Sequence, residues 1–428
     1  MGEAGPAGRV PAEVAPLPGG LVGRRAGDTL GGRVPGCGPM TVGAFRTVDH
    51  HGPLRAVVVG AGAMGRAWLN TVDASPTVDL VGVVDLDPNA ATAALSACGV
   101  PPVPVSTSLS ALAEATLPDL VVDVTIPSAH YSVTREALDL GLAVLGEKPL
   151  AATLAEAIGL VVAAERAGRL FAVSQNRRHS PGLAALRRQV WTLGAVGTVS
   201  TEFFRAPRFG GFREEMEHPL LLDMAIHPFD AARYLVGGDP VTVWCEEFNP
   251  HWSWYRGDAA ATAIFEMTGG VRYLYTGSWC APGLETSWNG RWRVSGRHGA
   301  AVWDGEGEPV VEHAVPVAGA AEAAAESRAR GWGSPSPTDI AGSLADFEHA
   351  LRTGLAPSTV AADNLLSLAM VHGAIASAGT GTRVVIADLL AEAHRDAVDG
   401  ADEDLRPALR DWRPPTPGGN GGGSGAGT

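Results

Sequence analysis

The sequence predicts an α/β protein in which a doubly wound parallel sheet precedes a second α/β domain with an open, mostly antiparallel sheet. Up to about residue 177, short continuous apolar runs alternate with stretches of helical periodicity. That pattern is typical of strands buried on both faces of a parallel sheet. From residue 178 onward, strand-like segments follow one another with few helices between them, which favours an antiparallel sheet.

Six strand candidates define the first domain, residues 53–177. They lie at 54–60, 78–87, 103–106, 118–126, 142–149 and 169–178. Helices are expected after the first five strands: one ending near residue 74, one starting at residue 88, and three covering 108–116, 128–140 and 153–167. Strands and helices that alternate at this spacing predict a parallel sheet covered by helices on both faces.

The second domain is placed at residues 178–388. Its strand candidates are 197–206, 240–248, 259–267, 271–279 and 291–296, and its helix candidates are 219–236, 338–353 and 360–379. Segments rich in Gly, Pro and Ala without apolar periodicity predict disorder. Residues 1–52 are therefore expected to be a disordered extension, residues 316–337 a flexible segment, and residues 389–428 a largely disordered tail.

Composition restricts the class of protein. With 46% apolar and 18% charged residues, the chain has the make-up of a soluble globular protein. The net charge of −14 argues against nucleic acid or an anionic membrane as a partner, because both bind clustered Lys and Arg. No apolar run reaches the roughly 20 residues of a membrane span.

Cysteine usage indicates the compartment. Cys37, Cys98, Cys245 and Cys280 are far apart in sequence and form no CxxC pair. This spacing suits a reducing cytoplasm, where the protein is expected to reside, and argues against a structural zinc site. No metal is expected.

A glycine motif follows the first strand. Gly60, Gly62 and Gly65 form GxGxxG at the point where the strand ends and a helix begins. Free N–H groups at such a helix start bind a pyrophosphate. Asp85, 20 residues past Gly65, ends the second strand, where a carboxylate binds both ribose hydroxyls and repels a 2′-phosphate. The motif predicts a dinucleotide-binding (Rossmann) domain that takes NAD rather than NADP, with Asp87 as an alternative ribose ligand or a helix cap.

Three further residues point to proton transfer. Lys148 is the single lysine among 32 basic residues, and lysine, unlike arginine, can lose its proton in a protein. Asp223 and His227 are four residues apart in a predicted helix, so their side chains share a face. An imidazole oriented by a carboxylate is a good base near neutral pH, and a lysine beside an oxygen stabilises an alkoxide. The alternatives are that Lys148 is merely a cation in a loop, and that Asp223 and His227 form an intrahelical hydrogen bond with no catalytic part.

Three motifs together identify a family. GAGAMG at 60–65, GEKP at 146–149 and LLLDMAIHPFD at 220–230 occur in the order found in the Gfo/Idh/MocA oxidoreductases, which include inositol, glucose and other sugar dehydrogenases. The sequence resembles this family over residues 54–388. It departs from it in having MEHPLLLD, without the usual glycines, before the aspartate, and in a Trp-rich second domain. Both departures concern the substrate.

The resemblance implies roles for individual residues. Lys148 would lie against the reacting hydroxyl and the nicotinamide, His227 would accept the hydroxyl proton, and Asp223 would bind substrate or orient the base. Pro149 would follow a cis bond. Independently of the resemblance, Asp230 is expected to be structural. The residues expected to bind the cofactor are Gly60, Gly62, Ala63, Met64, Gly65, Asp85, Thr125, Pro127, His130, Glu147, Lys148 and Gln175.

The resemblance also implies a function. The first hypothesis is NAD-dependent oxidation of a secondary hydroxyl of a sugar, a sugar derivative or a cyclitol. The alternatives are glycoside cleavage assisted by a tightly held NAD and, with least support, a non-catalytic NAD-binding sensor. A homo-oligomer, dimer or tetramer, is expected through the outer face of the second sheet.

Aromatic clusters at 251–257 and 287–292 have two interpretations. Either they pack within the second sheet, or their rings stack on a sugar whose hydroxyls meet Arg256, Asn289 and Arg291.

Overall fold

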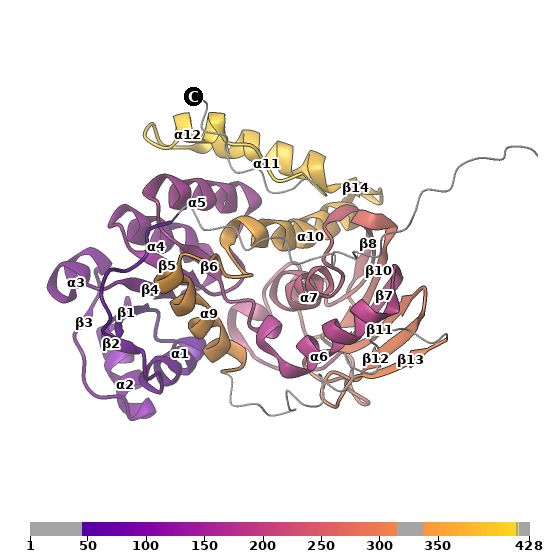
Figure 1. Ribbon diagram of the computed structural model, residues 1–428, viewed down its shortest axis with the longest axis horizontal. Helices are drawn as coiled ribbons and strands as arrows, with labels where there is room; N and C mark the ends of the chain where they lie inside the picture. The colour runs from indigo at the N-terminus through magenta and orange to yellow at the C-terminus, as the bar shows by residue number, and fades with distance from the viewer. Residues whose placement is uncertain (1–44, 315–336, 417, 419–428) are drawn as a thin grey trace, which may run out of the picture. The chain divides into compact units, whose positions relative to one another are not determined.

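A computed structural model describes residues 45–314, 337–416 and 418 (Figure 1). Within these residues the chain forms a six-stranded sheet and an eight-stranded sheet. The predictions for residues 1–44, for 316–336 and for the last residues of the tail, 417 and 419–428, lie outside the described residues.

The first sheet is parallel throughout, as predicted. Its strands are β1 (Leu54–Val59), β2 (Val78–Val84), β3 (Val105–Ser106), β4 (Leu120–Asp123), β5 (Ala143–Gly146) and β6 (Phe171–Val173). Their spatial order is β3-β2-β1-β4-β5-β6, so the direction of winding reverses between β1 and β4. In open α/β sheets the ligand binds at this reversal, outside the carboxyl ends of the strands.

Helices cover both faces of the first sheet, as predicted (Figure 1). They are α1 (Ala63–Asp73), α2 (Pro88–Cys98), α3 (Leu109–Thr116), α4 (Pro127–Asp139), α5 (Leu154–Ala167) and, far along the chain, α9 (Asp339–Thr353). Helices α3, α4 and α5 share a core with one face, whereas α1, α2 and α9 share a core with the other. The predicted division at residue 178 therefore differs from the structure for α9. Its apolar stripe, with Leu344, Phe347 and Leu351, is buried on the first sheet.

The second sheet is mostly antiparallel, as predicted. Its strands are β7 (Val196–Phe204), β8 (Pro240–Phe248), β9 (Ala260–Met267), β10 (Arg272–Ser278), β11 (Arg291–Gly296), β12 (Gly299–Trp303), β13 (Val310–His313) and β14 (Val384–Val385). The order is β13-β12-β11-β7-β10-β9-β8-β14, and among these neighbours only β7 and β10 run parallel. The short strands β12, β13 and β14 carry too little apolar alternation to have been predicted.

Helices bury one face of the second sheet. They are α6 (Pro181–Val190), which the sequence did not predict, α7 (Ile226–Val236) and α10 (Ala361–Thr380). The segment predicted as one helix at 219–236 begins instead as a π-helical turn, Leu220–Ala225, before α7. Among the described residues, 3₁₀ turns lie at Asn176–His179, Trp191–Leu193, Gly211–Arg213 and Thr268–Gly270.

Two segments predicted to be disordered are ordered in part. In residues 45–52, the N–H groups of Arg46 and Val48 donate to the carbonyls of Gly168 and Leu351, both at 3.0 Å. The predicted tail starts inside α11 (Ile386–Gly400), and α12 (Arg406–Asp411) follows. Helix α11 buries Ile386, Leu390, Ala393 and Ala397, a stripe at helical spacing that only its tertiary partners reveal.

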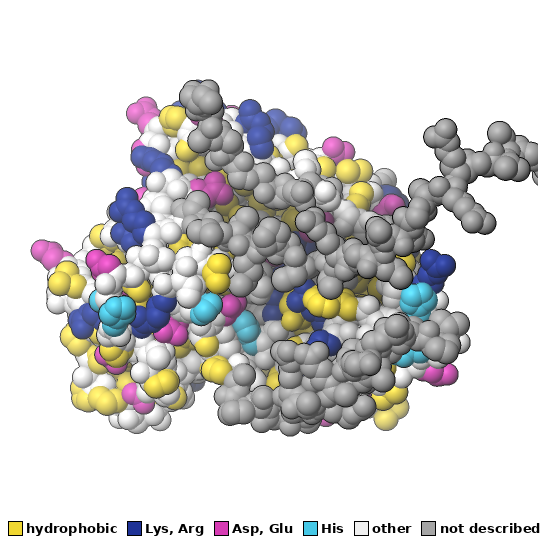
Figure 2. All heavy atoms as spheres, viewed as in Figure 1, with side chains coloured by type: hydrophobic (Ala, Val, Ile, Leu, Met, Phe, Trp, Pro, Cys, Tyr) yellow, Lys and Arg dark blue, Asp and Glu magenta, His cyan; other side chains and the backbone are white. Residues whose placement is uncertain are grey.

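The surface carries both charges. On the face drawn in Figure 2, basic and acidic side chains are interspersed, and no continuous basic area is visible among the coloured atoms. None of the helices in the described ranges has the length and apolar character of a membrane span.

Candidate active site

The carboxyl ends of the parallel strands bring the predicted cofactor residues to one edge of the first sheet. Gly60 follows β1, Asp85 follows β2, Thr125 follows β4, Glu147 follows β5 and Gln175 follows β6. Residues more than 100 positions apart in sequence thus meet beside the reversal between β1 and β4.

The glycine loop has the shape of a phosphate cradle. Gly60 has φ +103°, and a Cβ there would lie 2.8 Å from the carbonyl oxygen of Val124. A Cβ on Gly65 would lie 2.2 Å from the carbonyl oxygen of Gly60, whereas one on Gly62 would meet no protein atom within 4 Å. Helix α1 begins after Gly62 with no side-chain cap. The free N–H groups of its first turn, which holds Ala63 and Met64, fit a pyrophosphate lying against Gly62.

The carboxylate of Asp85 is held against this loop. Its Oδ2 accepts a 2.7 Å hydrogen bond from the Ala61 N–H, and its Oδ1 accepts a 2.9 Å bond from the Asp87 N–H. Asp87 accepts from the Asn89 N–H and caps α2, one of the two roles predicted for it. Asp85 is thus the carboxylate oriented toward the glycine loop.

Lys148 and Asp223 form the contact between the end of β5 and the π-helical turn. Lys148 Nζ donates 2.7 Å hydrogen bonds to both the main-chain oxygen and Oδ1 of Asp223. Arg213 Nε donates to Oδ2 of the same carboxylate at 2.7 Å. Burial would raise the pKa of Asp223, but the two cations outweigh it and lower that pKa below its usual value. Asp223 is therefore an anion held between two cations.

His227 does not pair with Asp223, although the sequence spacing predicts that they can contact. No hydrogen bond joins the two side chains in the structure as described. The Asp223 oxygens instead accept from Lys148 and Arg213. Asp223 lies in the π-helical turn, where the α-helical i, i+4 rule does not hold. Burial, followed by the positive charges of Lys148 and Arg177, lowers the pKa of His227 well below its ordinary value. His227 is therefore a neutral imidazole at pH 7.

A small cavity opens beside His227. Its volume is about 10 Å³, room for one water molecule, and its lining includes Arg177, Thr201, His227, Trp288, Asn289 and Trp292. Arg177 donates to Asn289, whose own amide donates to the Gly305 carbonyl at 2.7 Å. Of the polar residues predicted near the aromatic clusters, Asn289 reaches the cavity. Arg256 and Arg291 are exposed and lie 3.7 Å from Glu217 and Glu202.

His130 bridges the loop after β4 and the loop after β5. It is 2% exposed, its Nδ1 lies 2.7 Å from the Pro149 carbonyl oxygen, and its Nε2 lies 3.0 Å from the Thr125 carbonyl oxygen. Both ring nitrogens are thus engaged by the protein. The geometry favours a role in positioning the loops on either side rather than the predicted direct contact with a cofactor.

The residues around Lys148 are buried. Glu147 accepts a 2.8 Å hydrogen bond from Trp68 Nε1, and burial raises the pKa of Glu147 above its usual value. The peptide bond before Pro149 is cis, as expected.

Gln175 is buried, and its amide has no hydrogen-bond partner within the described part of the chain. Pro127 is the first residue of α4.

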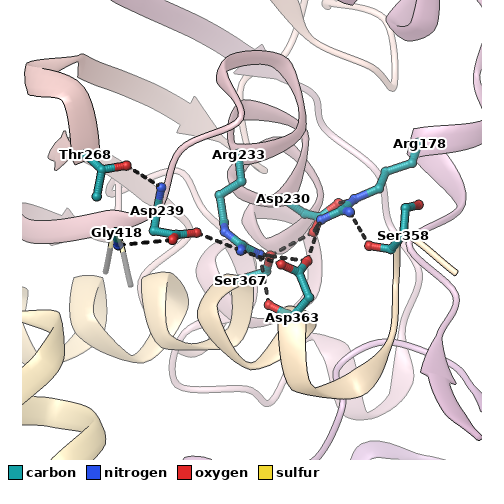
Figure 3. Close-up of polar contacts among 9 residues, drawn as sticks. All are labelled: Arg178, Asp230, Arg233, Asp239, Thr268, Ser358, Asp363, Ser367 and Gly418. Carbon is teal, nitrogen blue, oxygen red and sulfur yellow. Dashed lines mark hydrogen bonds and ion pairs between the residues drawn. The ribbon is translucent and has the colours of Figure 1, made fainter. Parts of the chain in front are cut away.

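An ion-pair network joins α7 to Arg178, which follows β6, and to α10 (Figure 3). Arg178 grips Asp230 through Nε at 2.7 Å and a terminal nitrogen at 2.6 Å. Arg233 binds Asp363 of α10 at 2.9 Å, and Ser367 donates to Asp230 at 2.7 Å. Asp230 is thus structural, as expected. Among the described residues no group of three His, Cys, Asp or Glu side chains could hold a metal ion.

Sequence reasoning missed Arg177 and Arg213, which set the charge around His227 and Asp223. Arginine is abundant in this chain, so only the tertiary contacts single these two residues out.

The fold and this site define an NAD-binding oxidoreductase. Two family descriptions match the chain: "Oxidoreductase family, NAD-binding Rossmann fold" over residues 54–175 and "GFO/IDH/MocA C-terminal domain" over residues 191–302. The chain belongs to the Gfo/Idh/MocA family, whose members act on hydroxyl groups of sugars.

Relatives and solved structures agree with this assignment. The chain is 28% identical to the uncharacterised protein y4oX of Sinorhizobium fredii, over 78% of this chain and 95% of the relative. It is 27% identical to D-apiose dehydrogenase of Paraburkholderia graminis, over 79% and 91%. The WlbA dehydrogenase of Chromobacterium violaceum, solved with NADH and UDP-GlcNAcA, superposes with TM-score 0.68 at 19% identity, covering 80% of this chain and 98% of that one.

Proposed function

We propose that this protein oxidises a secondary hydroxyl of a sugar, a sugar derivative or a cyclitol, with NAD as the hydride acceptor. The observation that carries the proposal is the Lys148 ammonium, which is held by Asp223 at the carboxyl edge of the first sheet while a neutral His227 lies nearby. Bound NAD supplies the chemistry of hydride transfer. The chain must supply a base, charge stabilisation and orientation.

His227 is the proposed base. A general base must be unprotonated before the reaction, and the lowered pKa of His227 meets that condition at neutral pH. Lys148 is proposed to stabilise the developing alkoxide and to relay its proton. It takes up the hydroxyl proton as it gives its own to His227, so that one hydride leaves for the nicotinamide and one proton ends on His227. Asp223 is proposed to orient Lys148 and to accept hydrogen bonds from substrate hydroxyls.

Asp85 supports NAD over NADP. Its carboxylate already accepts two main-chain hydrogen bonds beside the glycine loop, so it is held where a ribose would lie. A 2′-phosphate there would meet a fixed negative charge. Asp85→Asn is expected to weaken NAD binding and narrow the preference over NADP, as titration calorimetry with both nucleotides would measure.

Oligomerisation and location remain proposals. The outer face of the second sheet exposes Leu274 and a groove of about 430 Å³ lined partly by Trp292, Trp303 and Val310. An exposed sheet face of this kind favours burial against a second copy. Free thiols at Cys98, Cys245 and Cys280 are consistent with the proposed cytoplasmic location.

The function is tested with NAD and a panel of free sugars, inositols and glycosides, following NADH absorbance and aglycone release together. NADH formation with one substrate class, lost in Lys148→Arg while NAD still binds, is the expected result. Arginine keeps the charge but cannot exchange a proton, so this variant isolates proton transfer from simple charge. Aglycone release without net NADH would replace the dehydrogenase by redox-neutral glycoside cleavage, and silence in both assays would favour the sensor.

A further inference from the structure

Three exposed aromatic side chains surround the approach to the active site. Phe209 is 49% exposed, Phe212 is 48% exposed and Trp288 is 38% exposed. We refer to these three as the aromatic rim. Large aromatic side chains of a soluble protein are ordinarily buried, and a cluster left in water marks a binding surface.

The rim is connected to the catalytic groups on one side. Arg213, which binds the Asp223 carboxylate at 2.7 Å, has its guanidinium carbon 4.8 Å from the Phe212 ring centre and 5.3 Å from that of Phe209. One arginine thus spans the distance from the Lys148–Asp223 pair to two rim rings.

The aromatic rim is connected to His227 on its other side. Trp288 lines the cavity beside His227, and its ring centre lies 6.3 Å from that of Phe209. The guanidinium of Arg205 lies 4.3 Å from the Trp288 ring centre and is itself bound to Glu285 at 2.9 Å. Both stacked arginines are thus fixed by carboxylates, which preorganises the rim rings beneath them.

The cavity itself is too small to enclose a substrate. About 10 Å³ holds a water molecule, not a sugar ring, so a substrate whose hydroxyl reaches His227 through this cavity has its body outside the cavity, past Trp288 in the cavity lining. What it meets there is the rim. A polar sugar needs hydrogen-bonding groups, whereas exposed aromatic faces favour apolar and aromatic groups.

We propose that the substrate is a glycoside whose aglycone is aromatic or otherwise apolar. The sugar hydroxyl is oxidised at Lys148 and His227, and the aglycone packs on the aromatic rim. This inference rests on the proposed function and assigns the substrate class of the same site.

The first experiment compares matched substrates. For each of several hexoses and pentoses, the free sugar, its methyl glycoside and its 4-nitrophenyl glycoside are assayed with NAD and the full chain. An aromatic contact adds about 0.5–1.5 kcal/mol beyond area burial, so kcat/KM for the aryl glycoside should exceed that for the methyl glycoside by roughly two- to tenfold. Equal kcat/KM values would overturn the proposal.

Two variants and a matched control locate the contact. Phe212→Ala and Trp288→Ala should bring the ratio of aryl to methyl glycoside toward one. Trp191→Ala is the control, because Trp191 is 41% exposed and lies beneath Arg187 at 4.5 Å, much as Trp288 lies beneath Arg205, but is not in the rim. A ratio unchanged in both rim variants, or changed equally in the control, would contradict the assignment.

A binding measurement separates this inference from the proposed function. Saturation-transfer NMR of 4-nitrophenyl glycosides with the NAD-loaded protein reports contact without turnover. If the wild type binds aryl glycosides but oxidises none, and Phe212→Ala no longer binds them, the rim is supported as the aglycone site and the dehydrogenase function is rejected. Oxidation of free sugars with no binding of any aryl glycoside would retain the dehydrogenase and reject the rim.

Discussion

Lys148 and Asp223, 75 residues apart in sequence, share two hydrogen bonds of 2.7 Å. The lysine lies at the start of the loop after β5 of the first sheet, and the aspartate lies in the π-helical turn that leads into α7. A single contact thus joins the cofactor edge to the element that carries His227. Burial, followed by the positive charges of Lys148 and Arg177, lowers the pKa of this imidazole.

The pH dependence of oxidation should reflect the lowered pKa of His227. Because the pKa of His227 is lowered, the base stays unprotonated as pH falls below the ordinary histidine value of about 6.5, and kcat/KM should decline only at lower pH. Arg177→Gln removes one of the cations that lower this pKa, so the acid limb should move to higher pH. The pH profile of kcat/KM measures it.

Arg187→Gln serves as the control for that shift. Arg187 stacks on Tyr234 at 4.1 Å and is not among the groups that perturb His227. Acid limbs that coincide in wild type and Arg177→Gln would show that His227 is not the limiting base.

Replacing either of two glycines of the phosphate loop by alanine should have a different effect. In Gly62→Ala the new methyl group meets no protein atom within 4 Å, so the fold should persist while NAD binds at least roughly tenfold more weakly. In Gly65→Ala the methyl group would lie 2.2 Å from the Gly60 carbonyl oxygen, so folding stability itself should fall. Thermal unfolding and NAD titration of both variants distinguish these effects. If folded Gly62→Ala binds NAD with normal affinity, the pyrophosphate does not bind against Gly62.

His130→Gln should affect catalysis more than cofactor binding. Both His130 ring nitrogens lie within hydrogen-bond distance of carbonyl oxygens, Nδ1 of Pro149 and Nε2 of Thr125, so the ring ties the Lys148 loop to the loop after β4. Losing the bond to Pro149 should displace the Lys148 loop and lower kcat by roughly ten- to a hundredfold with a smaller change in NAD affinity. Steady-state kinetics and NAD titration of the variant measure both quantities. An unchanged kcat, or a loss of NAD affinity as large as the loss of kcat, would contradict this positioning role.

Asp230→Ala should destabilise the protein strongly. It leaves the Arg178 guanidinium buried without its main partner, which costs about 3–5 kcal/mol of unfolding free energy. Asp404→Ala is the contrasting variant, because Asp404 also binds two arginines, at 2.8 and 2.9 Å, but on the exposed surface, and should change stability little. Urea unfolding of both variants measures the difference. Similar midpoints would show that the network in Figure 3 does not anchor α7.

Much of the fold was predictable because its signals are local. Continuous apolar runs marked the six strands of the first sheet, and the glycine motif marked the start of α1. The tendency of aspartate to cap helices anticipated Asp87. The family motifs further placed Lys148 and Asp223 in one site, where the structure brings them together.

The remaining features depend on distant partners. The apolar stripes of α9 and α11 could be read as surface or tail until the first sheet and α5 supplied the surfaces that bury them. Likewise, four-residue spacing predicted that Asp223 and His227 could pair, but a π-helical turn and two cations from elsewhere in the chain redirected the carboxylate.

By itself, the sequence determined most of the strands and helices, the phosphate loop and the chemical types of the proposed catalytic residues, because each depends on near neighbours along the chain. Only the tertiary structure decided which charges surround His227, what Asp223 binds, and which aromatic rings remain exposed beside the site. These properties arise from burial and from Coulomb interactions over a few ångströms, and both depend on residues brought together from distant parts of the chain.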